Sequence, residues 1–285
     1  MVNEIKYYLC LDAVMELEAK PFGISDRIDE LISNLAEMEK AKFQEAQEVE
    51  LSRVNFVTPL SILPLAVYAN DNGLAINCTD RVNYNPCSYL GTIGFQFGVT
   101  EFSKTDKRYL PITKLSTKED NELLGQYEER ILSQTNLERV VLKHLTSELV
   151  NNVNEHAQVD QYWLLAQYYQ QPRPIIEIVL ADCGIGYKNS YKGTNFEVTN
   201  DTDAIINALE GRSSKTELNG RGFGIPSLVK IFVNTLGGKL IIMSGKSLIY
   251  YKPDEKRELK LKSYWQGALV GINFSPKAIN IYNCL

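Results

Sequence analysis

The stretch LTSELVNNVNEHAQ, residues 145–158, combines a helical apolar pattern with many polar side chains. Glu148 and Asn152 stand four residues apart, so on a helix both project from one face and can reach a common ligand. Asparagine is a poor helix former, yet it recurs at Asn151 and Asn154. A helix built only for packing would not carry this set. The stretch therefore predicts a binding or catalytic face, with an ordinary solvated helix face as the alternative.

Two glycine-rich turns follow this helix along the chain. In ADCGIG, an apolar run leads Asp182 into a turn that contains Gly184 and Gly186. In NGRGFGIPSLVKIF, glycines stand immediately before a helical pattern, as a phosphate-binding turn requires. Each turn alone is a weak signal, whereas the order of polar helix, Asp-Gly turn and glycine-rich turn is specific.

This order resembles the GHKL superfamily, whose Bergerat-fold ATP-binding domain occurs in gyrase, MutL, heat-shock chaperones, histidine kinases and anti-sigma serine kinases. The resemblance covers roughly residues 130–275. It implies ATP and Mg²⁺ as ligands, with Asn152 on the metal and Asp182 accepting a hydrogen bond from the adenine amino group. It also implies that Gly184 and Gly186 let the backbone approach the base.

The resemblance further implies phosphate contacts from the second glycine turn and from a lid over about residues 187–219. The residues are Ser214, Lys215, Gly220, Arg221, Gly222 and Gly224. Solvated loop charges are an equal alternative for Lys215 and Arg221. The late strand GALVGINF departs from the family, because Ala268 stands where many members have a threonine near the adenine-binding aspartate.

Within the superfamily, the residue four before the metal-binding asparagine is usually Glu in ATPases and anti-sigma serine kinases, and usually Asn in histidine kinases. Glu148 is therefore predicted to be catalytic, as the general base that activates a water or a hydroxyl. The chain has two histidines, His144 and His156, and both fall on the predicted helix, which disfavours histidine autophosphorylation. His156 is interpreted as a helix-end packing residue.

The predicted function is a Mg²⁺-dependent ATPase or Ser/Thr protein kinase that acts as a regulatory switch of the anti-sigma, partner-switching type. The alternative is a nucleotide-gated interaction protein, in which ATP binding controls dimer or partner contacts with little turnover. A DNA-acting clamp is disfavoured, since the net charge of −5 and the pI near 5.3 provide no broad positive field.

The chain is predicted to divide into an N-terminal α/β module, residues 1–118, and the ATP-binding domain, residues 119–285. The run from VNFVTPLSILPL to YLGTIGFQFGV, roughly residues 50–105, resembles a STAS-like module, which implies a regulatory protein partner. Thr58 and Ser61 are nearest the usual phosphoacceptor place of such modules. Any small α/β domain is the alternative to a STAS-like module.

The predicted fold class is α/β, as a two-layer sandwich with a mixed sheet covered by helices on one face, preceded by the smaller module. The five cysteines contain no C-x-x-C pair and predict neither a zinc site nor a disulfide framework, which favours a reducing cytoplasm. No basic leader and no window of roughly 18 apolar residues is found, so a soluble protein is expected. A homodimer is left open.

Overall fold

The computed structural model describes residues 28–43, 48–51, 58–78, 86–95, 97–99, 102, 110–118, 121–170, 173–212 and 224–284. At its centre lies a five-stranded sheet with the strand order β3-β4-β5-β7-β6. The strands are β3 (Thr113–Ser116), β4 (Gln161–Tyr169), β5 (Ile175–Ala181), β6 (Lys239–Lys252) and β7 (Glu255–Phe274). The sheet and its helices confirm a mixed α/β architecture.

All neighbouring strands described in this sheet are antiparallel, so the expectation of a mixed sheet is wrong for them. The connections explain the difference. β4 passes to β5 through residues 170–174, and β6 passes to β7 through residues 253–254. Connections this short join antiparallel strands, whereas parallel neighbours need a crossover of a dozen residues or more.

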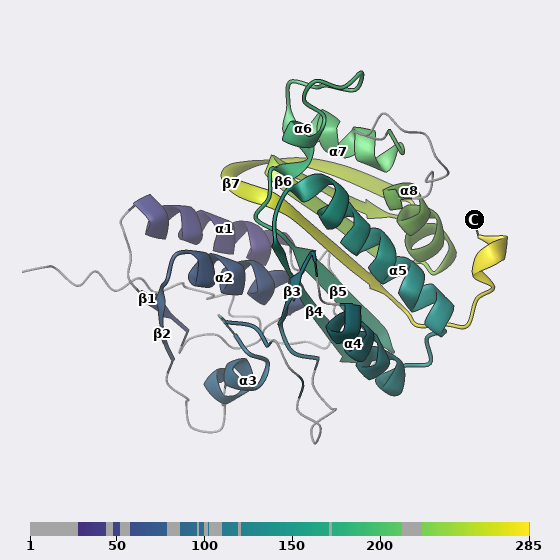
Figure 1. Cartoon of the computed structure of the whole chain (residues 1–285), viewed down its shortest axis with the longest axis horizontal. Helices are drawn as coiled ribbons and strands as arrows, with labels where there is room; N and C mark the ends of the chain where they lie inside the picture. The colour runs from purple at the N-terminus through teal and green to yellow at the C-terminus, as the bar shows by residue number, and fades with distance from the viewer. Residues whose placement is uncertain are drawn as a thin grey trace, which may run out of the picture.

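Helices cover both faces of the sheet, whereas one covered face was expected (Figure 1). On one face lie α4 (Asn121–Gln134), α5 (Arg139–Asn152), α6 (Gly186–Ser190), α7 (Asp201–Leu209) and α8 (Gly224–Leu228). On the other face lie α1 (Ile28–Phe43) and α2 (Pro59–Asp71). β5 shows why both faces are covered. Its Ile178 and Leu180 pack with the helices of the first face, and its Val179 and Ala181 pack with those of the other face. A strand that is apolar on both sides needs cover on both.

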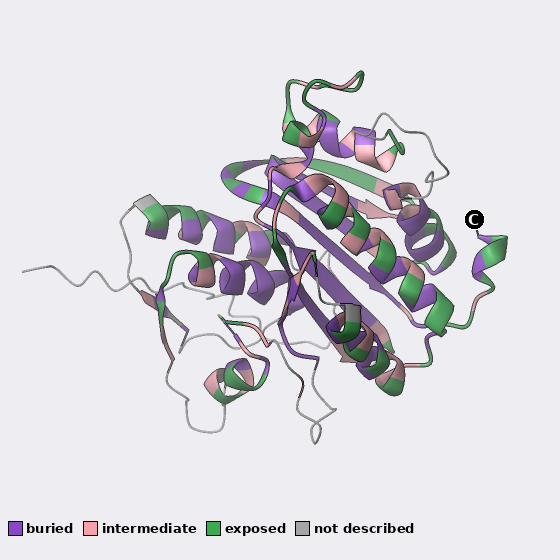
Figure 2. Cartoon of the chain, viewed as in Figure 1, coloured by how far each residue is buried: buried purple, intermediate pink, exposed green. Residues whose placement is uncertain are grey.

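Residues 120–157 carry a long helical pattern that the sequence leaves open as broken or continuous, and the structure has two helices there. α4 ends at Gln134 and α5 begins at Arg139. α5 continues into a π-helical turn, η2 (Val153–Ala157), and stops at Gln158, which adopts a left-handed conformation with φ of 55°. α5 is buried toward the sheet and exposed on its outer side (Figure 2). α8 likewise continues as a π-helix, η3 (Val229–Thr235), and a 3₁₀ turn, η4 (Ile281–Asn283), lies near the C-terminus.

The described N-terminal elements run in the order strand, helix, strand and short helix. β1 (Glu48–Glu50) pairs in parallel with β2 (Ala75–Asn77), α2 connects them, and α3 (Pro86–Thr92) follows. Segment 54–57, predicted as a strand, lies outside the described residues. β3 precedes the boundary predicted near residue 118 but is an edge strand of the large sheet, so the described sheet extends across that boundary.

The start of α2 is a capping box. The Thr58 side chain accepts a hydrogen bond from the backbone N–H of Ser61, and the Ser61 hydroxyl accepts one from the backbone N–H of Thr58. Both residues are only 2% exposed. Their hydroxyls therefore stabilise the helix start and are not accessible to a kinase, contrary to the suggested phosphoacceptor place.

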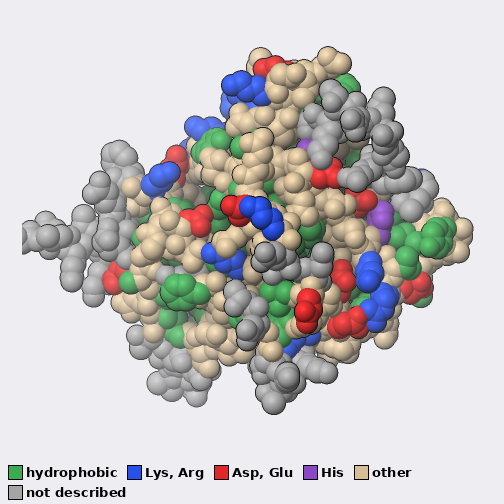
Figure 3. All heavy atoms as spheres, in the orientation of Figure 1, with side chains coloured by type: hydrophobic (Ala, Val, Ile, Leu, Met, Phe, Trp, Pro, Cys, Tyr) green, Lys and Arg blue, Asp and Glu red, His purple; other side chains and the backbone are tan. Residues whose placement is uncertain are grey.

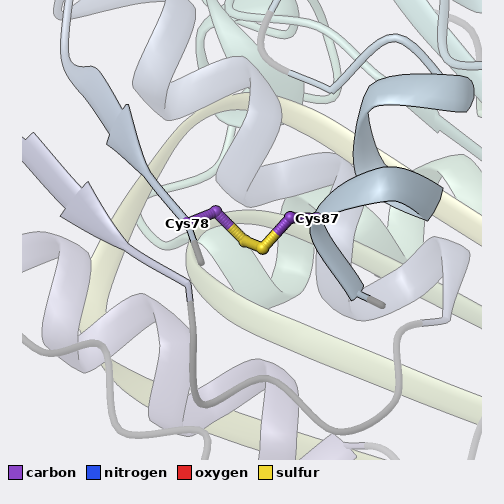
Figure 4. Close-up of a disulfide and its surroundings, with 2 residues drawn as sticks. All are labelled: Cys78 and Cys87. Carbon is purple, nitrogen blue, oxygen red and sulfur yellow. A yellow bond between two sulfur atoms is a disulfide. The ribbon is translucent and has the colours of Figure 1, made fainter. Parts of the chain in front are cut away.

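Cys78, which follows β2, and Cys87 in α3 form a disulfide (Figure 4). The expectation of no disulfide is therefore wrong for this pair. A separation of nine residues is not a spacing that predicts a disulfide. The bond forms because the fold brings the end of β2 beside α3. Across the described ranges, none of the helices has the length and apolar character needed to span a bilayer.

Candidate functional site

A pocket of about 370 Å³, part of it open to solvent, lies between α5, the turn after β5 and the end of β7. It is lined by Leu149, Asn152, Val153, His156, Ala157, Leu180, Asp182, Gly186, Tyr187, Ser190, Ala268 and Val270. The fold thus brings the first two sequence motifs, represented by Asn152 and Asp182, to one pocket.

Asp182 is the most buried charged group of this pocket, with 3% of its surface exposed. Its Oδ1 accepts hydrogen bonds from the backbone N–H of Gly184 at 2.8 Å and of Ala268 at 3.3 Å. Among the described residues, these are the only hydrogen bonds to its side chain, and both go to Oδ1. Burial raises the pKa of Asp182 to about 6, although the two amide bonds act in the opposite direction.

The Asp-Gly turn packs closely against the end of the polar helix. A Cβ on Gly184 would lie 2.2 Å from the backbone oxygen of Ala157, and that oxygen accepts a hydrogen bond from Ile185 at 2.9 Å. Gly186 has φ of +72°, and a Cβ there would lie 2.7 Å from the Ser244 hydroxyl. Both glycines therefore permit close contacts within the protein that a side chain would prevent. The approach of their backbone to a base stays a prediction.

Gly267 is a site residue that the sequence analysis missed. It has φ of +89°, and a Cβ would lie 2.2 Å from the backbone oxygen of Asp182. The Ser244 hydroxyl donates to its carbonyl at 2.7 Å. The neighbouring Gln266 donates from Nε2 to the backbone oxygen of Gly184. The only sequence signal was the glycine that opens the run GALVGINF, which lies inside β7.

Asn152 lines the pocket from the end of α5. Its Nδ2 donates to the backbone oxygen of Glu148 at 2.8 Å, which leaves Oδ1 to act as a ligand atom. Glu148 lies one turn earlier on α5 and does not line the pocket. The Glu148 side chain is half-buried, and its pKa is raised by burial and by the negative charge of Glu155.

The two histidines have different environments. His156 lines the pocket at the end of the polar helix, and its Nε2 lies 4.0 Å from a carboxylate oxygen of Glu155. His144 faces α8, where its Nε2 lies 2.8 Å from the Ser227 hydroxyl, and burial lowers its pKa. The Ser227 hydroxyl also donates to the backbone oxygen of Gly224 at 2.9 Å. These bonds fix the start of α8 beside α5.

Of the predicted phosphate contacts, the structure describes Gly224, which begins α8 with φ of +30°. Ser214, Lys215, Gly220, Arg221 and Gly222 lie outside the described residues. The structure describes the predicted lid as far as residue 212. Within it, the Asn207 side chain forms hydrogen bonds with residues on both sides of it in the sequence. Its Nδ2 donates to the backbone oxygen of Phe196 at 3.0 Å, and its Oδ1 accepts from Arg212 at 2.8 Å.

Among the residues that the structure describes, no group of three or more His, Cys, Asp or Glu side chains could hold a metal ion. Mg²⁺ at a nucleotide does not need such a group, because it keeps several waters and takes phosphate oxygens as ligands. The neutral oxygen of Asn152, one helical turn from the Glu148 carboxylate, fits this type of ligation.

Comparisons with family models, with curated proteins and with solved structures gave no match to this chain. The geometry of the site is therefore the basis of the functional argument.

The raised pKa of Asp182 predicts a pH-dependent cost of folding. The folded protein binds this proton more tightly than the unfolded chain, whose carboxyl titrates near 3.8. The stability contributed by the protonated group is complete below about pH 4 and is lost as the pH rises through about 6. Relative to Asp182→Asn, the unliganded protein should lose about 3 kcal/mol over this window. Urea unfolding of both proteins from pH 4 to 7 measures it, and a constant difference would contradict it.

Proposed function

We propose that this chain is a Mg²⁺-dependent ATP-binding protein of the GHKL type, acting as a regulatory ATPase or Ser/Thr protein kinase. One observation carries the proposal: Asn152 and Asp182, selected from separate motifs, line the same pocket. Two further features support it. The Asp182 Oδ2 accepts no hydrogen bond from the residues that the structure describes, and the described start of the glycine-rich helix lies beside α5.

The proposed recognition of adenine follows from the hydrogen-bonding groups. The exocyclic amino group of adenine is a donor, and the Asp182 carboxylate is an acceptor in a poorly hydrated setting. Guanine presents an oxygen acceptor at the same ring position, which the carboxylate would repel. The aliphatic side chains of Leu149, Val153 and Val270 provide apolar contact for the base.

The proposed chemistry uses α5. Asn152 Oδ1 would hold Mg²⁺, which when bound neutralises negative charge on the phosphates. Glu148 would take the proton from the attacking water or Ser/Thr hydroxyl. Its raised pKa makes it a better proton acceptor than an ordinary solvated glutamate.

Glu148→Gln should lower the rate of phosphate release or transfer by about a hundredfold or more, because the amide cannot accept the proton. ATP affinity should change little, since Glu148 does not line the pocket. Labelled ATP with Mg²⁺, followed into free phosphate and into protein, measures turnover, and calorimetry measures binding. Glu138→Gln is the control, because Glu138 is exposed at the start of the same helix and its side chain makes no capping hydrogen bond.

A second candidate is a nucleotide-gated interaction protein with little turnover. It is favoured by the position of Glu148 outside the pocket lining. In that case Glu148→Gln would leave the regulatory output intact, and wild-type protein would bind ATP without releasing phosphate. If Glu148→Gln lost turnover but retained the regulatory output, the enzymatic proposal would be overturned and nucleotide binding would remain in place.

We propose a regulatory protein as the partner, with a homodimer as the other candidate assembly. On the face seen in Figure 3, described acidic and basic side chains are interspersed, which favours protein over nucleic acid. The cytoplasm is the proposed location because ATP is supplied there. Disulfides are uncommon in that compartment, so the ligand and not the Cys78–Cys87 bond supports this location.

A further inference from the structure

α2 lies on the sheet face opposite the pocket and contacts β4 and β5. It is joined to the β5 segment at both ends. At its start, the backbone N–H of Leu60 donates to the buried carboxylate of Glu177 at 3.1 Å. At its last residue, Asp71 Oδ2 accepts a hydrogen bond from the thiol of Cys183 at 2.9 Å. The two contacts, together with the packing of α2 on β4 and β5, show that helix and strand run side by side.

Cys183 directly follows Asp182, and the two side chains lie on opposite faces of the sheet. Asp182 lines the pocket, whereas Cys183 packs with the cluster that contains α2. On the pocket side, the Asp182 carboxylate is oriented by backbone amides of Gly184 and Ala268. On the opposite side, the Cys183 contact with Asp71 restrains the same turn.

The end of α2 is itself held in place. Asn70 Oδ1 accepts a hydrogen bond from the Lys114 ammonium at 3.3 Å, and that ammonium lies 5.0 Å from the centre of the Trp163 ring. Lys114 and Trp163 belong to β3 and β4 and are paired across the sheet. Asp71 is therefore presented to the Asp182 turn from a fixed position.

We propose that Asp71, although outside the pocket, is a positioning residue of the nucleotide site that holds the Asp182 turn through Cys183. This inference rests on the proposed function. A hydrogen bond from the adenine amino group depends on the placement of the carboxylate to within a few tenths of an ångström. Loss of the contact behind the turn lets the carboxylate move, and nucleotide affinity falls without any change in the pocket lining.

The test is ADP binding by calorimetry in the full chain with Mg²⁺. Asp71→Ala should weaken ADP binding about fivefold to tenfold, and Asp71→Asn, which keeps an acceptor oxygen, should restore most of the affinity. Asn72→Ala is the matched control. It removes a 2.8 Å hydrogen bond to the Tyr68 backbone at the same helix end without touching the Asp182 turn, so affinity should not change.

Cys183→Ala completes a double-mutant cycle with Asp71→Ala. The double variant should bind ADP no more weakly than either single variant, because one contact is lost in all three. Wild-type protein that binds no nucleotide would overturn the proposed function and this inference together. Wild-type binding with Asp71→Ala unchanged would overturn the positioning role alone. Equal weakening in Asp71→Ala and Asn72→Ala would also overturn it, because general loosening of the helix end would then explain the effect.

Discussion

Asp182→Asn is expected to weaken binding of ADP and ATP by about a hundredfold. The substitution removes a charged acceptor, worth about 1.5–3 kcal/mol in a hydrogen bond, and can place an amide donor opposite the amino donor of adenine. Asn Oδ1 can still accept from the amides of Gly184 and Ala268, so the turn should keep its shape. Calorimetry with each nucleotide in Mg²⁺ measures the loss.

The same variant separates binding from folding. Removing a buried carboxylate whose pKa is raised to about 6 relieves a cost at pH 7, so Asp182→Asn should be at least as stable as the wild type. Asp254→Asn, at an exposed position in the turn between β6 and β7, serves as the control and should bind nucleotide normally. Unchanged affinity in Asp182→Asn would contradict the proposed base contact.

Gly267→Ala is expected to have the largest effect on stability. Its φ of +89° is strained for alanine, and the new Cβ would lie 2.2 Å from the backbone oxygen of Asp182. Because the obstacle is backbone, relief requires β7 to move away from the turn after β5. We expect a loss of about 4 kcal/mol or more in the free energy of unfolding, with loss of nucleotide binding as Asp182 is displaced.

Gly237→Ala is the matched control for that substitution. Gly237 also has a positive φ, +68°, but nothing lies within 4 Å of its added Cβ. It should cost about 1 kcal/mol from backbone strain alone. Urea unfolding of both variants gives the comparison. Equal losses would show that the close approach of Gly267 to Asp182 is unimportant.

Local sequence patterns predicted the main elements well. QYWLLAQYY and PIIEIVLA read as strand-like runs, and they form β4 and β5. Residues 24–47 repeat apolar side chains with the period of an amphipathic helix, and this segment contains α1. Periodicity identifies these elements because one or both sides of each are buried. It does not say which helices cover a strand that is apolar on both sides. The second covered face of the sheet and the placement of α2 against β5 therefore required the structure.

At the candidate site, too, local patterns predicted some features and the structure was needed for others. Asn152 and Asp182 were selected because their residue types and chain order carry chemistry, and the fold brings them to one pocket. Gly267 was missed because its constraint comes from the backbone of Asp182, far away in the sequence. Asp71 contacts Cys183, which is 112 residues away in the sequence, and the Cys78–Cys87 bond likewise joins separate elements. Local pattern reading has no signal for contacts of this kind.

The most direct test of the proposed nucleotide site compares ADP with inosine diphosphate by titration calorimetry on wild-type protein in Mg²⁺. The two ligands share sugar and phosphates, but inosine carries an oxygen where adenine carries the amino group. The expected result is saturable ADP binding and a loss of about a hundredfold with inosine diphosphate. Equal affinities, or no heat from either ligand, would contradict an adenine nucleotide held by Asp182.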